Sequence, residues 1–331
     1  MKKTIYFFMA LATIALSSCK KQEEAGKSSL AGSANATLTI GIADKTTKAA
    51  ISSSESKINS LQVFVFRPDG TLDAYGSGTV AEITLSCTTG PKDIYAIVNA
   101  PSLSSITSKG ALIATVSNLT DNSLTNFVMT GCKSSMNVTA DATVSIPVSR
   151  IVARIGIAKI TNKMSAAAYQ NQALTVTKIY ALNVAGSNNL GLSANNPAAS
   201  STWFNKMSYV SGPADNLIFD SVTGGSISYD ASNTTAHYFY VYPNGTATDS
   251  EATAWSARFT RIVVEATLGG VTYFYPISIP GIASNKTYTI TNLTITRPGS
   301  LSPDQPVTTA NCTFNITVAD WMPGTSGETI I

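Results

Sequence analysis

The chain has 331 residues, of which 12% are charged, with 22 basic against 19 acidic residues. So small a charge excess gives no electrostatic footprint for nucleic acid, and no nucleic-acid partner is expected. No phosphate-binding loop or dinucleotide fingerprint is present, and no Cys or His cluster has the spacing of metal ligands. We therefore expect neither a cofactor nor a metal.

The first 18 residues have the pattern of a secretory signal. Two lysines precede an apolar run, residues 5–16, that is too short to span a membrane, and two serines follow it. The segment LSSC, which ends at Cys19, resembles the lipobox of bacterial lipoproteins, in which this cysteine is lipidated and becomes the new N-terminus. The alternative is an ordinary signal peptide with an incidental cysteine. We expect removal of residues 1–18 and lipid on Cys19.

A polar tether precedes the first predicted strand. Residues 20–35 are rich in Ser, Ala, Gly and charge, so they cannot bury much apolar area. Strict alternation in ATLTIGI, residues 36–42, then predicts a strand whose buried face contains Leu38, Ile40 and Ile42. A polar connector with two lysines follows and looks open to a protease.

The rest of the chain consists of short predicted strands separated by turns. In the first half the strands are LQVFVF (61–66), TVAEITLSC (79–87), IYAIVNAP (94–101), NVTADATVSIPV (137–148) and RIVARIGIAKI (150–160), with turns at 67–70 and 88–93. In the second half they are AHYFYVYPNG (236–245), ARFTRIVVEATLGGVTYFYPISI (257–279, a hairpin turning at 268–270), KTYTITNLTI (286–295) and CTFNITVADW (312–321). Short helices are expected within residues 102–117 and 163–174.

This pattern predicts a mainly β protein, long enough for two sandwich domains, with one or two short helices. We place an N-terminal domain at residues 49–149 and a C-terminal domain at residues 150–331, because a proline near position 147 interrupts two strand-like runs.

Three cysteines follow Cys19. Cys87 and Cys132 could pair in an oxidising compartment and leave Cys312 alone. The alternative is that all three are small buried hydrophobes.

No catalytic constellation stands out. The single histidine, His237, lies in an aromatic strand, and no G-x-S-x-G nucleophile elbow accompanies it. Trp203, Trp255 and Trp321 could offer a stacking platform for a sugar, although such aromatics more often fill a core. No enzymatic activity is expected.

In their order and spacing, several weak motifs together resemble the fimbrillin family, the subunits of type V pili. These motifs are the lipobox at Cys19, TKAAISSSESKINSLQVFVFRPDGTL (47–72), IYAIVNAP, FVMTG (127–131), VSRIVARI (148–155), YTITNLTITRPGSLSPDQPV (288–307) and ITVADW (316–321). The resemblance implies two β-sandwich domains of transthyretin-like type. It also implies export as an outer-membrane lipoprotein and a cut after a basic residue by a maturation protease.

In this chain the cut is expected between Lys48 and Ala49, or as second choice between Lys45 and Thr46. Many family members carry arginine at that place, whereas this chain has lysine. Residues 19–48 would then be the tether and a removable first strand. Without a cut, the chain would stay lipid-anchored, as anchor subunits do.

The resemblance implies that the C-terminal segment of another subunit fills the groove left by the removed strand. Here that donor strand would present Phe314, Ile316 and Val318. The expected function is that of a structural subunit of a cell-surface fimbrium, which supports adhesion and has other pilus subunits, identical or homologous, as partners. The alternative is a tip adhesin or a glycan-binding surface lipoprotein.

Overall fold

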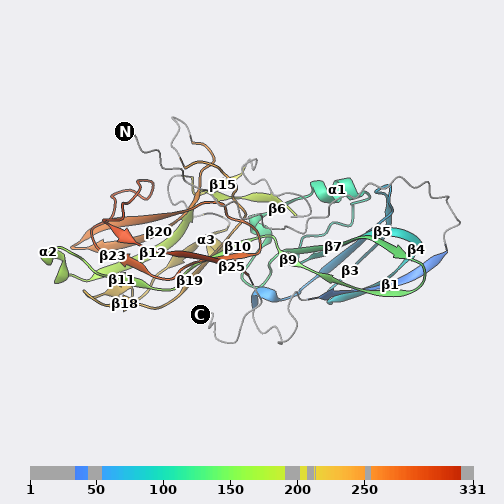
Figure 1. Ribbon diagram of the computed structural model, residues 1–331, viewed down its shortest axis with the longest axis horizontal. Helices are drawn as coiled ribbons and strands as arrows, with labels where there is room; N and C mark the ends of the chain where they lie inside the picture. The colour runs from blue at the N-terminus through green and yellow to red at the C-terminus, as the bar shows by residue number, and fades with distance from the viewer. Residues whose placement is uncertain are drawn as a thin grey trace, which may run out of the picture.

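The computed structural model describes residues 34–43, 54–190, 202–206, 212, 214–249 and 255–321. These residues form an elongated molecule of two β-rich parts that lie end to end along the long axis (Figure 1). The predicted mainly β fold is confirmed. Within the described ranges, no helix has the length and apolar character needed to cross a membrane.

The N-terminal part is a sandwich of two sheets, with strand orders β4-β1-β8 and β3-β2-β5-β7-β9. Apolar side chains from the facing strands β1, β2 and β5 close its core, as in other sandwiches. The elements are β1 (Asn35–Ala43), β2 (Leu61–Phe66), β3 (Leu72–Gly78), β4 (Glu82–Thr88), β5 (Gly90–Val98), α1 (Lys109–Ala114), β6 (Val116–Asn118), the 3-10 turn η2 (Leu119–Asp121), β7 (Met129–Val138), β8 (Ala142–Pro147) and β9 (Ser149–Arg150).

The C-terminal part contains sheets ordered β19-β10-β22-β25, β18-β11-β23-β24 and β16-β12-β20-β21, with β17 paired to β12 and β13 paired to β15. The elements are β10 (Ala153–Ile157), β11 (Ile160–Asn162), α2 (Ala167–Gln170), β12 (Leu174–Leu182), β13 (Val184–Ala185), β14 (Ser187–Asn189), β15 (Trp203–Phe204), α3 (Asp215–Ile218), β16 (Phe219–Ser221), β17 (Ser226–Ile227), β18 (Ser232–Asn233), β19 (His237–Val241), β20 (Thr260–Leu268), β21 (Val271–Ile279), β22 (Lys286–Ile290), β23 (Leu293–Ile295), β24 (Cys312–Thr313) and β25 (Ile316–Asp320).

The two parts are packed against each other. Strand β6 of the first pairs antiparallel with β14 of the second. The ring of Phe127, which precedes β7, lies 4.7 Å from that of Tyr240 in β19. One continuous cluster of buried apolar residues includes members of both parts. The molecule therefore has an apolar junction instead of a loose linker.

Most of the predicted elements occur, but several strands, among them β3 and β12, were not predicted. Strand β2 has the predicted bounds, the hairpin β20–β21 turns at Gly269 and Gly270, and α1 and α2 lie within the predicted windows. Helix α3 was not predicted. The predicted turn at 88–93 is wrong, because β5 already begins at Gly90, whose φ of 111° allows an abrupt crossing from one sheet to the other.

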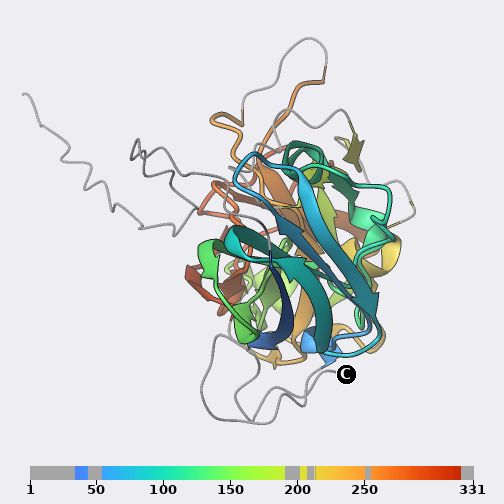
Figure 2. The same ribbon diagram turned by 90° about the vertical axis from the view of Figure 1, so that its right-hand side faces the viewer.

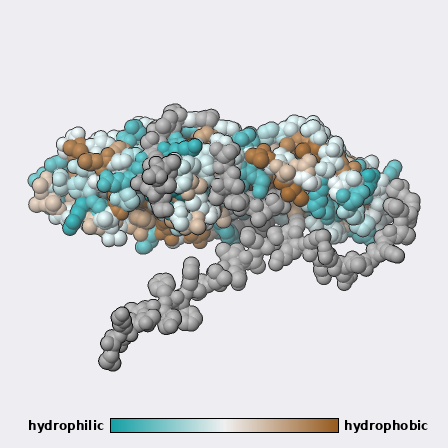
Figure 3. Space-filling view, turned by 90° about the horizontal axis from the view of Figure 1, so that it is seen from above, coloured by the Kyte–Doolittle hydropathy of each residue, from teal (hydrophilic) through white to brown (hydrophobic). Residues whose placement is uncertain are grey.

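The surface of the described residues has no large apolar area on the face shown in Figure 3. The brown areas there are small and are separated by teal and white surface. Exposed large apolar side chains are scattered along the chain, at Val80, Val116, Leu124, Tyr229, Val271, Leu301 and Val318. Scattered apolar residues are normal on a protein surface and do not by themselves mark a docking site.

Candidate functional site

Strand β1 is the central strand of its three-stranded sheet. It pairs antiparallel with β4, from Asn35 opposite Thr88 to Gly41 opposite Glu82, and parallel with β8 on its other side. Figure 2 looks onto this end of the molecule, where dark blue β1 lies beside green β8. Without β1, β4 and β8 would be two separate strands, each unpaired along both of its edges.

The apolar face of β1 is sealed in the core. Leu38 and Ile40 have no exposed surface, Ala36 is 3% exposed, and Ile42 is half-buried. These side chains pack with buried residues of β2 and β5 in the opposite sheet. The structure therefore places the three residues predicted to face a groove on one buried face of a single strand.

Two glycines bring the neighbours of β1 close to the opposite sheet. A Cβ on Gly76 of β3 would lie 2.9 Å from Cγ2 of Ile83 in β4, and a Cβ on Gly131 of β7 would lie 2.2 Å from the carbonyl oxygen of Pro147 in β8. A glycine inside a strand often marks such a close approach. Strands β4 and β8 thus have contacts with the five-stranded sheet that do not involve β1.

A buried ion pair fixes the end of β4. The backbone N–H and the hydroxyl of Thr88 both donate to the carboxylate of Asp73, and Nζ of Lys92 lies 3.0 Å from the same carboxylate. Burial raises the pKa of Asp73, but the hydrogen bonds from Lys92 and Thr88 outweigh burial and hold the pKa below its ordinary value. The ionised carboxylate therefore ties β4 to β3.

Strand β25, in the segment predicted as a donor, lies in a very different position. It pairs antiparallel with β22 only, from Ile316 opposite Ile290 to Asp320 opposite Lys286. Phe314 and Ile316 are half-buried against the core, whereas Val318 is 57% exposed. Among the described residues β25 is an edge strand, and only two of the three predicted donor residues touch the core.

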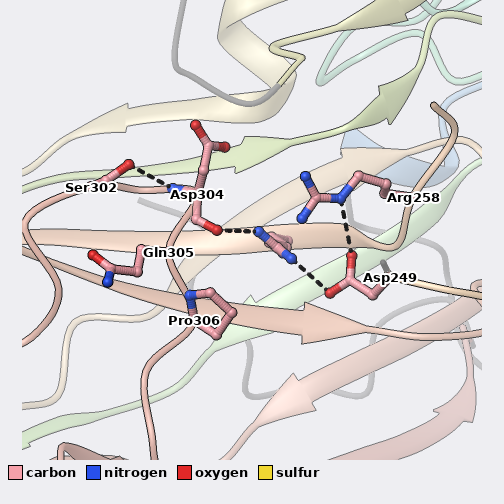
Figure 4. Close-up of a pocket in the computed structure, with 7 residues that line it drawn as sticks. Asp249, Arg258, Ser302, Asp304, Gln305 and Pro306 are labelled. Carbon is pink, nitrogen blue, oxygen red and sulfur yellow. Dashed lines mark hydrogen bonds and ion pairs between the residues drawn. The ribbon is translucent and has the colours of Figure 1, made fainter. Parts of the chain in front are cut away.

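A polar cavity of about 380 Å³ opens in the C-terminal part (Figure 4). Arg261 donates to the carboxylate of Asp249 and to the carbonyl oxygen of Asp304, both at 2.8 Å, and Nε of Arg258 lies 3.6 Å from Asp249. The other lining residues are Ser302, Gln305 and Pro306. The charges pair with each other and no aromatic ring lines the cavity, so its lining offers no stacking platform for a sugar.

His237 pairs with an acid but with no nucleophile. Its Nδ1 lies 2.6 Å from the carboxylate of Asp220, and its buried Nε2 has no hydrogen-bond partner in the described part of the chain. A triad would need a hydroxyl or thiol at that nitrogen. Within the same residues, no group of three His, Cys, Asp or Glu side chains could hold a metal ion.

The tryptophans fill cores. Trp203 and Trp321 are buried, and the ring of Trp255 packs 5.4 Å from that of Trp203. Of the two alternatives left open for the cysteines, the pairing of Cys87 with Cys132 does not occur, because both of these described residues are free thiols. Cys87 lies on β4 opposite Ala36, and Cys132 lies on β7 in the other sheet.

The predicted lipidation and cleavage residues, and the last part of the predicted donor segment, lie outside the described ranges. They are Cys19, Lys45, Thr46, Lys48 and Ala49, together with the chain after Trp321. The close approaches at Gly76 and Gly131 and the pair Asp73–Lys92 were missed from the sequence. The glycine within the strand-like FVMTG was an available signal for the close approach at Gly131.

Residues 34–150 match the family model described as Major fimbrial subunit protein (FimA). The predicted resemblance to the fimbrillin family is confirmed. The fimbrillin match begins one residue before β1 and ends at the last residue of β9, so it contains β1 and both of its neighbouring strands. A search of curated protein sequences finds no match.

Solved structures share the fold over most of the chain. A protein of Bacteroides eggerthii described as a cell adhesion protein is 22% identical, with a TM-score of 0.68 over 87% of this chain and 96% of that one. A fimbrilin (FimA) of Porphyromonas gingivalis is 19% identical, with a TM-score of 0.60 over 87% and 98%. A Parabacteroides distasonis cell adhesion protein is 17% identical, with a TM-score of 0.63 over 88% and 100%.

These similarities show a common fold. Fimbrillins are structural subunits, in agreement with the prediction that the chain is not an enzyme.

Proposed function

We propose that the chain is a structural subunit of a cell-surface fimbrium that binds neighbouring subunits by strand exchange and supports adhesion. The fimbrillin match and the shared fold support the fimbrial assignment. The observation that carries the exchange mechanism is the position of β1, which is buried, central in its sheet and directly followed by the lysine-bearing connector.

Removal of β1 would leave a groove of defined shape. The contacts at Gly76 and Gly131 and the pair Asp73–Lys92 hold the walls β4 and β8 to the opposite sheet. A strand from another subunit would restore both hydrogen-bonded ladders and fill the pockets of Leu38 and Ile40. Each buried aliphatic side chain contributes about 1.5–3 kcal/mol, so such a contact would be hard to dissociate.

Maturation belongs to the same proposal. The precursor is exported, attached to the outer membrane through lipid on Cys19, and cut between Lys48 and Ala49 or between Lys45 and Thr46. Mass spectrometry of the N-terminus of surface material tests this directly. We expect chains that start at Ala49 or Thr46. Recovery of chains that begin only at acylated Cys19 would contradict the cut and indicate an anchor subunit.

Lipidation has a separate test. The Cys19→Ala variant should be misrouted and absent from surface polymers, because the precursor loses its membrane attachment. The Ser28→Ala variant, with its substitution in the tether, is the matched control and should assemble normally. Normal surface polymers of the Cys19→Ala variant would contradict the proposal.

The donor is the C-terminal segment with Phe314, Ile316 and Val318. Deletion of residues 313–331, and separately Ile316→Asp, should leave secretion intact but abolish high-mass ladders on unheated gels. Ladders that persist after the deletion would place the donor elsewhere. Immunogold labelling separates a stalk subunit from the tip-adhesin alternative, since a stalk subunit labels the whole filament and a tip adhesin labels one end.

A further inference from the structure

The two parts of the molecule meet at a buried acid, Glu55, in the 3-10 turn η1 (Ser54–Ser56). Glu55 is 5% exposed. Its carboxylate accepts hydrogen bonds from the hydroxyl of Tyr240 at 2.6 Å and from the indole Nε1 of Trp321 at 3.1 Å, and it pairs with Arg154 at 3.1 Å. Side chains from β19, from β10 and from the residue after β25 therefore converge on one carboxylate.

A second arginine completes this cluster. Arg150 donates from Nε to the carbonyl oxygen of Glu55 at 3.1 Å, from Nη2 to the hydroxyl of Ser56, and from Nη1 to the carbonyl oxygen of Trp321 at 3.4 Å. Its guanidinium carbon also lies 4.4 Å from the centre of the Trp321 ring. Trp321 is thus held by its indole N–H, its ring face and its carbonyl group.

Apart from this cluster, β25 is secured by one ladder, by the half-buried Ile316 and by a surface ion pair of Asp320 with Lys286. Only Ile316 of its five residues is half-buried, and the other four are exposed. The strand has one ladder of hydrogen bonds, to β22, and the N–H of Trp321 donates to the carbonyl oxygen of Asn285 at 3.0 Å. The deep side-chain contacts at this end of the chain are those of Trp321.

We propose that Glu55 and its four partners Arg150, Arg154, Tyr240 and Trp321 form a latch that holds the C-terminal segment in its own subunit and limits the rate at which the segment leaves. The latch rests on the proposed strand exchange only in its second role, the control of assembly. Its first role, the retention of β25, is a property of the single chain.

The chemistry of the cluster makes opening cooperative. A buried carboxylate is stable only while its charge and lone pairs are satisfied, and removal of one partner leaves the others poorly paired. Burial raises the pKa of Tyr240, and the nearby Glu55 carboxylate adds to the effect, so the hydroxyl remains a hydrogen-bond donor at neutral pH. Withdrawal of Trp321 takes from Glu55 one donor and from Arg150 both an acceptor and a ring contact.

Hydrogen exchange of the uncut full chain, read by mass spectrometry, tests the first role. Glu55→Gln keeps the size of the side chain but removes its charge, and the amides of residues 317–321 should then exchange about tenfold faster or more. Tyr240→Phe removes one hydrogen bond and should give a smaller increase. Glu265→Gln is the matched control, because Glu265 pairs with Lys178 at 3.0 Å in the β12–β20 ladder. Wild-type exchange of these amides in both latch variants would overturn the proposal.

Assembly after cleavage at the connector tests the second role. Polymer ladders of Glu55→Gln should form faster than those of wild type by a similar factor. If the Glu55→Gln variant assembles no faster than wild type, the proposed control of assembly is wrong. Faster exchange of β25 in a chain that never polymerises would instead contradict strand exchange and leave the retention role in place. If Glu55→Gln does not fold, the Tyr240→Phe variant decides both arms.

Discussion

Strands β1 and β25 are similar in sequence pattern but opposite in structural role. Both alternate apolar and polar residues, yet β1 has a partner strand on each side and a sealed face, whereas β25 has one partner and four exposed residues. Leu38 and Ile40 have no exposed surface, and Val318 is 57% exposed.

This difference indicates how each strand can be released. Withdrawal of β1 breaks two ladders and uncovers a core, so a strand in this position is expected to stay until another strand competes for the groove. Withdrawal of β25 breaks one ladder and the contacts of Trp321. In the proposed assembly, a cut near β1 and the latch near β25 would therefore be two distinct controls on two unequal strands.

A pair of matched substitutions should reveal this inequality most strongly. Ile40→Asp places a carboxylate in the sealed face of β1 and should lower the free energy of unfolding of the full chain by about 4 kcal/mol or more. Val318→Asp on exposed β25 should change it by no more than about 0.5 kcal/mol. Urea unfolding followed by circular dichroism measures both, and equal losses would contradict the contrast.

The pair Asp73–Lys92 should give the next largest effect. Asp73→Asn leaves Lys92 buried without its counter-charge and should cost about 3 kcal/mol at pH 7. The pKa of Asp73 is lower in the folded than in the unfolded chain, so its contribution is present above about pH 4 and is lost as the pH falls through the folded value. Unfolding curves between pH 7 and pH 2 should show a shallower loss of stability in the variant than in wild type. An unchanged acid slope would contradict this role.

The wall of the β1 groove should be sensitive to a single methyl group. Gly131→Ala puts a Cβ against the carbonyl oxygen of Pro147 and should cost about 2 kcal/mol and reduce strand uptake after cleavage. Gly110→Ala in α1 is the control, because no neighbouring heavy atom lies within 4 Å of a Cβ placed at Gly110. We expect that control to be neutral or slightly stabilising. Equal thermal midpoints for the two variants would show that β8 is not held at Gly131.

The labelling rates of two buried thiols should report separately on the release of β1 and of the C-terminal segment. Burial raises the pKa of Cys312 to about 11, and burial together with the charge of Asp73 raises the pKa of Cys87. Both should react slowly with iodoacetamide at pH 8 in the uncut chain. Loss of β1 should expose Cys87, which lies opposite Ala36, and departure of the C-terminal segment should expose Cys312. Labelling of both at one rate would mean that the strands leave together.

The sequence predicted the elements whose local pattern reports burial. Period-two alternation marks a strand with one covered face, which is why β1 was found, whereas β2 was found as an apolar run that is buried at every position. The same pattern does not show whether the edges of a strand are paired with neighbouring strands or exposed to solvent. That is why Val318 was expected in an apolar face and is exposed.

The residues of the latch were hidden for a different reason. Glu55 lies in the polar stretch SSSESK, which has the composition of a loop, and its partners are 95 or more positions away in sequence. The two-residue strands β13, β15 and β17 likewise form only because a distant strand supplies the ladder. Pairing over such separations depends on the tertiary fold, which local propensity does not encode.

The elongated shape has a consequence for the polarity of a filament. Strand β1, whose removal would open the proposed groove, lies in one half of the molecule and β25 in the other (Figure 1). Under the proposed exchange, a contact between the groove and β25 would join two different surfaces, so it would be heterologous, would have no twofold axis, and would repeat as an open filament where the rotation between subunits does not close a ring. Such a filament ends in an empty groove on one side and an unused C-terminal segment on the other. A small fraction of Ile316→Asp chains, which can accept but not donate a strand, should therefore cap growing filaments at one end only.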